Sequence, residues 1–313
     1  MAVLTKLGEG WVLLADSFRF LRKKPIFLVP LFFSWIFVAA IVLILRYYIY
    51  FGIPHSLEEF YLILLFIFLI IFLITLIICM ANIVMLEFIQ QIELGEKISF
   101  GKALKEAVIL DSYKVIPVAL IWAIVWFIIL IIKVLTSKKK GRTSRPTPSP
   151  RDAALTLAGY NSGPFSWFKL GLRMFEKLFR MYIFLTLPAI AWENKGPFSA
   201  FKRSLEIIKK HPLQFLTTYT LTGVAAFFMA IPILIILLMV RAGMDFPDLF
   251  WMGVIIYEGI VWTLGIYLEQ MSVGLLYLWH LKWVKNGETG ELSSVPRPDL
   301  LDEYYELKEY AKI

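Results

Sequence analysis

Cysteine and histidine are scarce in this chain. Its 313 residues include a single cysteine, Cys79, and three histidines. One cysteine inside an apolar run provides neither a disulfide nor a cysteine-based metal site. The histidines (His55, His211 and His280) stand in separate segments. The sequence therefore predicts no metal centre and no bound cofactor.

Charged residues are also few, at 18% of the chain against 59% apolar residues. A typical soluble domain carries about 25% charged residues. The net charge of +8 does not indicate a nucleic-acid partner, because the Lys and Arg residues form blocks beside apolar runs. The composition predicts an all-α, polytopic transmembrane helical bundle embedded in a lipid bilayer.

Sequence motifs of enzymes are missing. The chain contains no H-E-x-x-H, no G-x-S-x-G and no G-x-x-x-x-G-K motif. Lipid-transfer chemistry would need paired acidic residues to hold a divalent cation. The only candidates, Glu93 with Glu96 and the group Asp299, Asp302 and Glu303, do not form such a motif. We therefore expect the protein not to be an enzyme.

Long apolar runs are abundant instead, and a helix needs about 20 such residues to cross the hydrocarbon core. The first run, 25–45, is longer than the 7–15-residue core of a cleaved signal peptide, so we interpret it as a retained span. The other predicted spans, for a total of six, are 60–86, 115–135, 167–192, 213–240 and 249–279.

The fourth predicted span is uninterrupted only over 181–192. Before that run, Lys169, Arg173, Lys177 and Arg180 recur at spacings of four, four and three, which is one face of a helix. Twelve apolar residues cover only about 18 Å of a core that is about 30 Å thick. Some of these cations must then pair, extend to the interface or line a wet cavity.

The sixth predicted span offers partners for these cations. Glu258 and Glu269 are eleven residues apart, which places them on one helix face. Counting from the inner ends of both helices puts Arg180 level with Glu269, and Lys169 or Arg173 near Glu258. We predict an ion-pair ladder between the fourth and sixth spans.

Three roles remain open for this ladder. It can join helices, it can form part of a solute or ion path, or it can bind anionic lipid headgroups. Asn82 in the second span is a further candidate for the same polar interior.

An internal repeat organises the chain. The segment "WVLLADSFRFLRKKPIFL" aligns without gaps with "FSAFKRSLEIIKKHPLQFL" at an offset of 187, so that Ser17 matches Ser204 and Pro25 matches Pro212. A fainter third copy, "FGKALKEAVILDSYKVIPVAL", also has a proline where its span begins, although chance similarity is an alternative there. The pattern predicts three units, each an amphipathic helix followed by a two-span hairpin. The predicted units are 5–93, 97–193 and 196–285.

The helix that leads each unit is basic on one side. Such a helix lies in the headgroup region with its cations near anionic lipid. A proline in the first turn of the next span allows a sharp change of direction. The predicted headgroup-binding residues are Arg22, Lys23, Lys24, Lys202, Arg203, Lys209 and Lys210.

The distribution of Lys and Arg predicts the orientation. If both termini are cytoplasmic, 19 of the 32 Lys and Arg residues lie on the inner side, as the positive-inside rule favours. The basic Pro/Ser insert 137–164, with the sequence "SKKKGRTSRPTPSPRD", then lies outside against that rule. The tail 286–313 is predicted to be cytoplasmic and to offer a surface for a protein partner or a second copy. We expect a multi-pass protein of the plasma membrane.

The text "LPAIAWENKGPF" followed by "RSLEIIKKH", together with "LLYLWHLKWVKNGETG", resembles an uncharacterised family of prokaryotic six-span integral membrane proteins. That family is distantly similar to the membrane domains of some glycerophosphodiester phosphodiesterases. The resemblance implies six helices with cytoplasmic amphipathic helices, and it supplies no catalytic residues. The chain departs from the family in the insert 137–164, and it lacks the soluble phosphodiesterase barrel.

Two functions fit these observations. The first is a transporter-like or channel-like protein whose three units surround a central crevice. The alternative is a membrane organiser or partner subunit that binds anionic lipid and another protein. A polar cavity that reaches Glu258 or Glu269 would favour the first, and a closed bundle with paired charges would favour the second.

Overall fold

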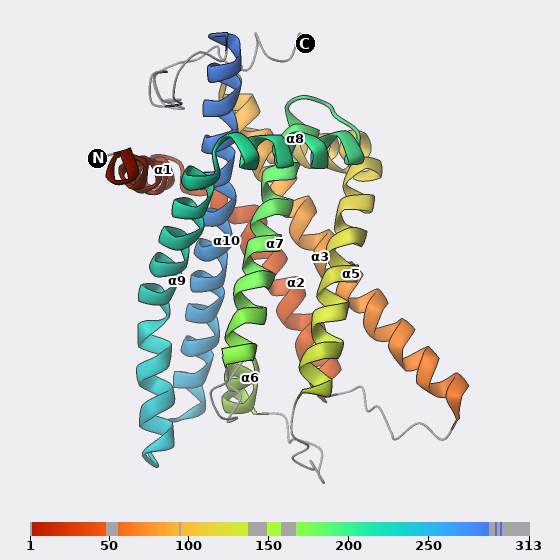
Figure 1. Ribbon diagram of the computed structural model, residues 1–313. Coiled ribbons are helices and arrows are strands. Elements are labelled where there is room, and N and C mark those ends of the chain that lie inside the picture. The colour runs from red at the N-terminus through yellow and green to blue at the C-terminus, as the bar shows by residue number, and fades with distance from the viewer. Residues whose placement is uncertain are drawn as a thin grey trace.

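The structure is a computed structural model that describes residues 2–47, 56–93, 95–136, 149–157 and 167–287, together with Leu292 and Val295. Over these residues the chain is helical and contains no strand. The long helices run side by side (Figure 1). They are α2 (Leu28–Tyr47), α3 (Leu57–Glu93), α5 (Ser112–Leu135), α7 (Trp167–Ala191), α9 (Pro212–Arg241) and α10 (Asp248–Lys285). The shorter elements are α1 (Ala2–Lys23), η1 (Pro25–Phe27), α4 (Phe100–Glu106), η2 (Ala107–Asp111), α6 (Pro150–Leu157) and α8 (Pro197–Lys210).

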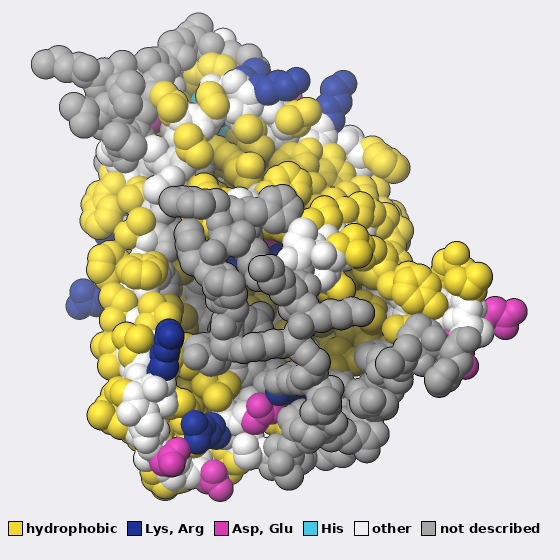
Figure 2. Space-filling view, turned by 60° about the horizontal axis from the view of Figure 1, so that its bottom comes forward, with side chains coloured by type: hydrophobic (Ala, Val, Ile, Leu, Met, Phe, Trp, Pro, Cys, Tyr) yellow, Lys and Arg dark blue, Asp and Glu magenta, His cyan; other side chains and the backbone are white. Residues whose placement is uncertain are grey.

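Five helical stretches are long and apolar enough to cross a membrane, so the chain is a helical membrane protein. They are Pro25–Tyr47, Leu57–Ile92, Phe100–Leu135, Pro212–Arg241 and Asp248–Lys285. Hydrophobic side chains cover most of the flank of the described part, and the charged side chains in view lie mostly near its two ends (Figure 2). Helix α7 is not among the five because its first half carries charged residues, yet it packs against α3, α5 and α10.

Helix α10 lies at the centre of the bundle over its second half. Every residue from Ile266 to Trp283 is buried, whereas the half before Ile266 is only partly covered. Its neighbours change along its length, because α7 packs against α10 at Glu269 whereas Trp251 and Val254 pack with Ala154 of α6. The buried half therefore lies where the largest number of helices meet.

Helices α1 and α8 lie crosswise at the same end of the bundle, and the last turns of α10 extend beyond them (Figure 1). Helix α1 crosses α10 at Ser17, whose Oγ lies 3.1 Å from Oγ of Ser272 and whose carbonyl oxygen accepts a hydrogen bond from the Tyr267 hydroxyl at 3.0 Å. The crossing point is therefore on α10 between Tyr267 and Ser272.

The two crosswise helices end in the same way. Lys24 (φ −137°, ψ 71°) and His211 (φ −127°, ψ 51°) each interrupt the helix, and a proline begins the next element directly afterwards. Ser17 and Ser204 are both fully buried, and each hydroxyl donates to the carbonyl oxygen four residues earlier. The positions aligned in the sequence therefore have matching backbone and side-chain geometry.

The middle segment does not make this turn. Helix α4, the π-helical η2 and helix α5 follow one another without a break, and Pro117 lies inside α5. The π-helical turn adds one residue and shifts the register, but the helix continues through it, and Pro117 lies further on inside α5. The expectation that a separate interfacial helix turns into the membrane near Pro117 is therefore wrong.

Helix α6 was not expected, because the insert 137–164 reads as an extended Pro/Ser segment. Of this insert, 137–148 and 158–164 lie outside the described residues. Ala153 and Ala154 of α6 are buried, and Ala154 packs with Trp251 and Val254 of α10. At its first turn, Asp152 accepts two hydrogen bonds from Nη2 of Arg46, at 3.0 and 3.1 Å. The predicted tail lies outside the described part apart from residues 286, 287, 292 and 295.

Candidate functional site

Arg180 of α7 and Glu269 of α10 form a bidentate ion pair. Nε and Nη2 of Arg180 each donate to one carboxylate oxygen at 2.7 Å. The Glu269 side chain is only 4% exposed. Two parallel, charge-assisted hydrogen bonds fix the orientation of both groups. This is the contact that the residue spacing predicts.

Lys177 extends the pair to a third helix. Its Nζ lies 3.9 Å from Glu269 and donates to the carbonyl oxygen of Tyr219 at 2.6 Å and to Oγ1 of Thr222 at 3.2 Å. The same ammonium lies 4.7 Å from the centroid of the Tyr219 ring. Lys177, Arg180 and Glu269 are called the charge cluster below; with two cations and one carboxylate it has a net positive charge.

The part played by α9 was not predicted. Tyr219 and Thr222 lie in an apolar run, and the sequence gives no sign that a carbonyl oxygen there receives a lysine. A second unpredicted ion pair joins α7 to α5, where Nζ of Lys133 lies 2.6 Å from Glu176. Its signal was present, since Glu176 interrupts the row of cations on α7.

Of the two remaining cations of the predicted ladder, Arg173 has a described side chain and it does not meet a carboxylate. The Arg173 side chain is exposed and makes no ion pair within the described residues. The Lys169 side chain lies outside the described part. The expected pairing of Arg173 with Glu258 is therefore absent among the side chains that the structure describes.

Glu258 is nevertheless buried. Glu258 is 6% exposed, and neither of its carboxylate oxygens has a hydrogen-bond partner among the described residues. The physical reason is the change of neighbours along α10. Next to Glu258, Gly259 lies so close to Trp35 of α2 that an added Cβ would be 2.7 Å from the ring. The half of α10 that carries Glu258 thus meets α2, α6 and α9, and no described residue of these helices donates a hydrogen bond to Glu258.

Asn82 is fully buried but is not connected to the charge cluster by a hydrogen bond. Its Nδ2 donates to the carbonyl oxygen of Ile78 at 2.8 Å, within α3 itself. Its Oδ1 has no partner among the described residues. The structure therefore assigns Asn82 to the interior but not to the predicted ladder.

The two distant histidines His211 and His280 meet at the crosswise end of the bundle. Nε2 of His211 lies 3.0 Å from Nδ1 of His280, and both residues are buried. The ring of Trp283 lies 5.3 Å from His211 and 5.8 Å from His280, measured between centroids. They are 69 residues apart, so no sequence pattern predicts this pair.

The predicted headgroup residues divide into two groups. Arg203 and Lys210 of α8 are engaged in ion pairs with Glu206, at 3.2 and 3.0 Å, and Arg203 also approaches Glu193 at 3.4 Å. Partial burial of Glu206 acts to raise its pKa, but the hydrogen bond from Lys210 and the charge of Arg203 outweigh it, so that the pKa is lower than usual.

The other five headgroup residues are exposed and make no ion pair among the described residues. They are Arg22, Lys23, Lys24, Lys202 and Lys209. Five of the seven predicted cations are thus free to meet an anion, and they lie on α1 and α8 or at the α1–η1 junction.

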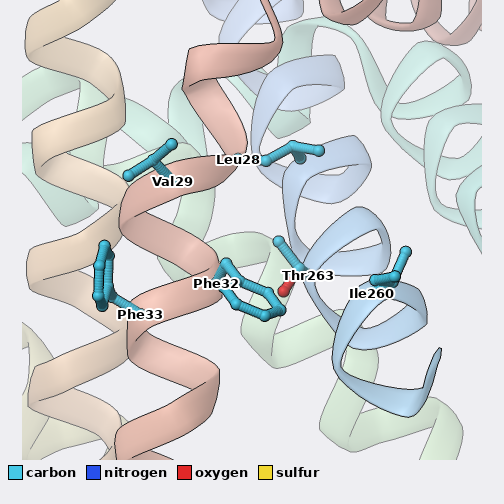
Figure 3. A pocket seen from close by; sticks show the side chains of 6 residues that line it. All are labelled: Leu28, Val29, Phe32, Phe33, Ile260 and Thr263. Atoms are coloured by element: carbon cyan, nitrogen blue, oxygen red, sulfur yellow. The ribbon is translucent and has the colours of Figure 1, made fainter. Parts of the chain in front are cut away.

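Two apolar cavities flank α2. One, of about 290 Å³, lies between α2 and α10 (Figure 3). The other, of about 510 Å³, lies between α2, α3 and the α4–η2 segment. Neither is lined by Glu258 or Glu269. These cavities are therefore not the polar crevice that a transporter was expected to show.

Comparison of the chain with protein-family models, with curated proteins and with solved structures found no match. The resemblance to the prokaryotic six-span family stays a prediction.

Proposed function

We propose that the protein spans the membrane six times, with α7 as the fourth span. The charged first half of α7 is compatible with a span because Lys177, Arg180 and Glu176 all have partners on neighbouring helices. The shared end of α1, α8 and the last turns of α10 is the cytoplasmic side, and the membrane is the plasma membrane. The matching ends of α1 and α8 support a repeat between the first and third units.

The function we propose is non-enzymatic transport of a proton, with Glu258 as the group that binds it. A proton does not need the solute-sized polar crevice that both described cavities fail to provide. The position of Glu258 carries this proposal. From Asp248 to the α1 crossing at Ser272, α10 contains 24 steps, or about 36 Å, which matches a hydrocarbon core of about 30 Å crossed with some tilt. Glu258 lies ten residues from Asp248 and is therefore near the middle of the bilayer.

An unpaired carboxylate at that depth is unfavourable, and a buried acid without a partner takes up a proton instead. An ionisable residue inside a membrane span is a functional candidate for the same reason. Glu269 stands on the same face of α10 about 16 Å closer to the α1 crossing, where two cations hold it. In this proposal the proton binds to Glu258, and the charge cluster marks the cytoplasmic end of the proton path.

The alternative is a membrane organiser that binds anionic lipid and a protein partner or a second copy. The observation that favours it is the composition of the crosswise helices. Phe198 of α8 is 78% exposed and lies one helical turn from the exposed Lys202, and its repeat partner Trp11 of α1 is 61% exposed. Aromatic and basic side chains together on one exposed surface are typical of a helix that lies in the headgroup region.

Proton flux separates the two functions. The purified chain is reconstituted in liposomes that contain a pH-sensitive dye, and a potassium diffusion potential drives proton entry. We expect the wild type to acidify the lumen, Glu258→Gln to fall to the rate of empty liposomes, and Asp248→Asn, a matched removal of charge at the exposed start of α10, to remain active. Equal rates for wild type and Glu258→Gln would contradict the transport proposal and favour the organiser.

A further inference from the structure

Helix α2 lies between two cavities that share one wall residue. Phe33 lines both the cavity of about 290 Å³ on the α10 side and the cavity of about 510 Å³ on the α3 side. In Figure 3, Leu28 and Phe32 lie on the α10 side of α2, whereas Val29 and Phe33 lie on the opposite side. Their volumes are near or within the range of about 300–1,000 Å³ that is typical of ligand sites.

One buried polar residue lies in the wall of the smaller cavity. Thr263 of α10 is 2% exposed, and its Oγ1 has no hydrogen-bond partner among the described residues. A helical threonine usually donates to a carbonyl oxygen of its own helix, as Thr222 does to Thr218 at 2.8 Å. Figure 3 shows the Thr263 oxygen beside the ring of Phe32, in the space between α2 and α10. The wall of the groove is therefore apolar, and the Thr263 hydroxyl lies behind it.

Two lysines, Lys23 and Lys24, precede the first residues of α2 that line the two cavities. Lys23 and Lys24 immediately precede Pro25, and both are exposed and make no ion pair among the described residues. Leu28, a wall residue of the smaller cavity, follows Lys24 by four residues, or roughly 8 Å along the helical chain. Pro30, a wall residue of the larger cavity, follows Lys24 by six residues, or nearly two helical turns.

We propose that one anionic, two-chain phospholipid straddles α2. Its phosphate lies against Lys23 and Lys24, and one acyl chain occupies each cavity. Two apolar grooves that meet at one helix and open below a pair of free cations match the shape and charge of such a lipid. This site does not depend on the transport function.

The experiment measures lipid binding to the full-length protein in detergent by native mass spectrometry, with dioleoylphosphatidylglycerol and dioleoylphosphatidylcholine as probes. We expect Lys23→Gln combined with Lys24→Gln to lower phosphatidylglycerol affinity roughly 30-fold, since each lysine near a headgroup contributes about 1 kcal/mol, and to leave phosphatidylcholine nearly unchanged. The matched control, Arg151→Gln combined with Arg241→Gln, removes two exposed cations at the opposite end of the bundle and should change neither affinity by more than about twofold.

The grooves are tested by filling them. Ala81→Phe in the larger cavity and Thr263→Leu in the smaller one should lower the affinity of both lipids, with thermal unfolding recorded to show that each variant is folded. Equal losses in the control variant, or unchanged binding by folded groove-filling variants, would overturn the proposal.

Discussion

Glu269 lies within reach of two cations of α7 at unequal distances, with Nε of Arg180 at 2.7 Å and Nζ of Lys177 at 3.9 Å. Because the two distances differ, removing Arg180 and removing Glu269 leave different charges unpaired. Without Arg180, the carboxylate still faces an ammonium. Without Glu269, two cations remain in a largely buried place and face no carboxylate.

The charge cluster predicts an asymmetry in stability. Removing one partner of a buried ion pair costs about 3–5 kcal/mol because the other charge is left uncompensated. We expect Glu269→Gln to lower the free energy of unfolding by roughly that amount, and Arg180→Gln by less, because Lys177 can move toward Glu269. Denaturant titration in mixed micelles measures both changes. A larger loss for Arg180→Gln would show that Lys177 does not compensate.

Glu258 should behave differently from Glu269 although both are acids of one helix face. Its carboxylate has no hydrogen-bond partner among the described residues, so Glu258→Gln removes no native contact. We expect its free energy of unfolding to be unchanged or slightly higher, within about 1 kcal/mol. The same titration checks this result. A loss equal to that of Glu269→Gln would mean that Glu258 is paired in the membrane.

The contact of α1 with α9 depends on Gly10. A Cβ built there would lie 2.3 Å from Oγ1 of Thr217, whereas nothing lies within 4 Å of a Cβ at Gly8, two residues earlier. We expect Gly10→Ala to destabilise the protein by roughly 1–3 kcal/mol through overpacking. Gly8→Ala is the matched control and should be neutral or stabilising by up to about 1 kcal/mol, as alanine favours the helix. Thermal unfolding measures both variants. An equal shift of the unfolding temperature in Gly10→Ala and Gly8→Ala would contradict the close contact at Gly10.

Helix α6 should cover the first half of α10, around Trp251, only while Asp152 binds Arg46. With Cys79 replaced by alanine, a cysteine introduced by Ala154→Cys reports exposure, because Ala154 is 1% exposed. We expect slow labelling by a membrane-impermeant maleimide, and labelling at least about tenfold faster after Asp152→Asn breaks the bidentate, partly buried contact.

The control for α6 is Arg151→Gln. It removes an ion pair with Asp245 in which both side chains are exposed, and such surface pairs contribute little. Its labelling rate should match that of the parent. If Asp152→Asn also left the rate unchanged, α6 would be held by its alanines rather than by Arg46.

The sequence predicts the helical membrane class and the Arg180–Glu269 contact, because apolar run length and helical spacing are local properties. It does not predict where α10 changes neighbours, since that depends on α6. This helix lies in an insert whose Pro/Ser content predicts an extended segment. For this reason the pairing expected for Glu258 is not found. The meeting of His211 with His280 and the reach of Lys177 to the Tyr219 carbonyl oxygen likewise depend on tertiary packing, which no spacing encodes.

We propose that Glu258 is an unpaired, proton-binding acid within the bilayer, and Glu269 is held in an ion pair. Reaction with a hydrophobic carbodiimide tests it most directly, because that reagent modifies protonated carboxyls in apolar surroundings. Peptide mapping by mass spectrometry of the reconstituted wild type should find Glu258 modified, increasingly so as the pH falls, and Glu269 unmodified. Modification of Glu269 with protection of Glu258 would contradict the account.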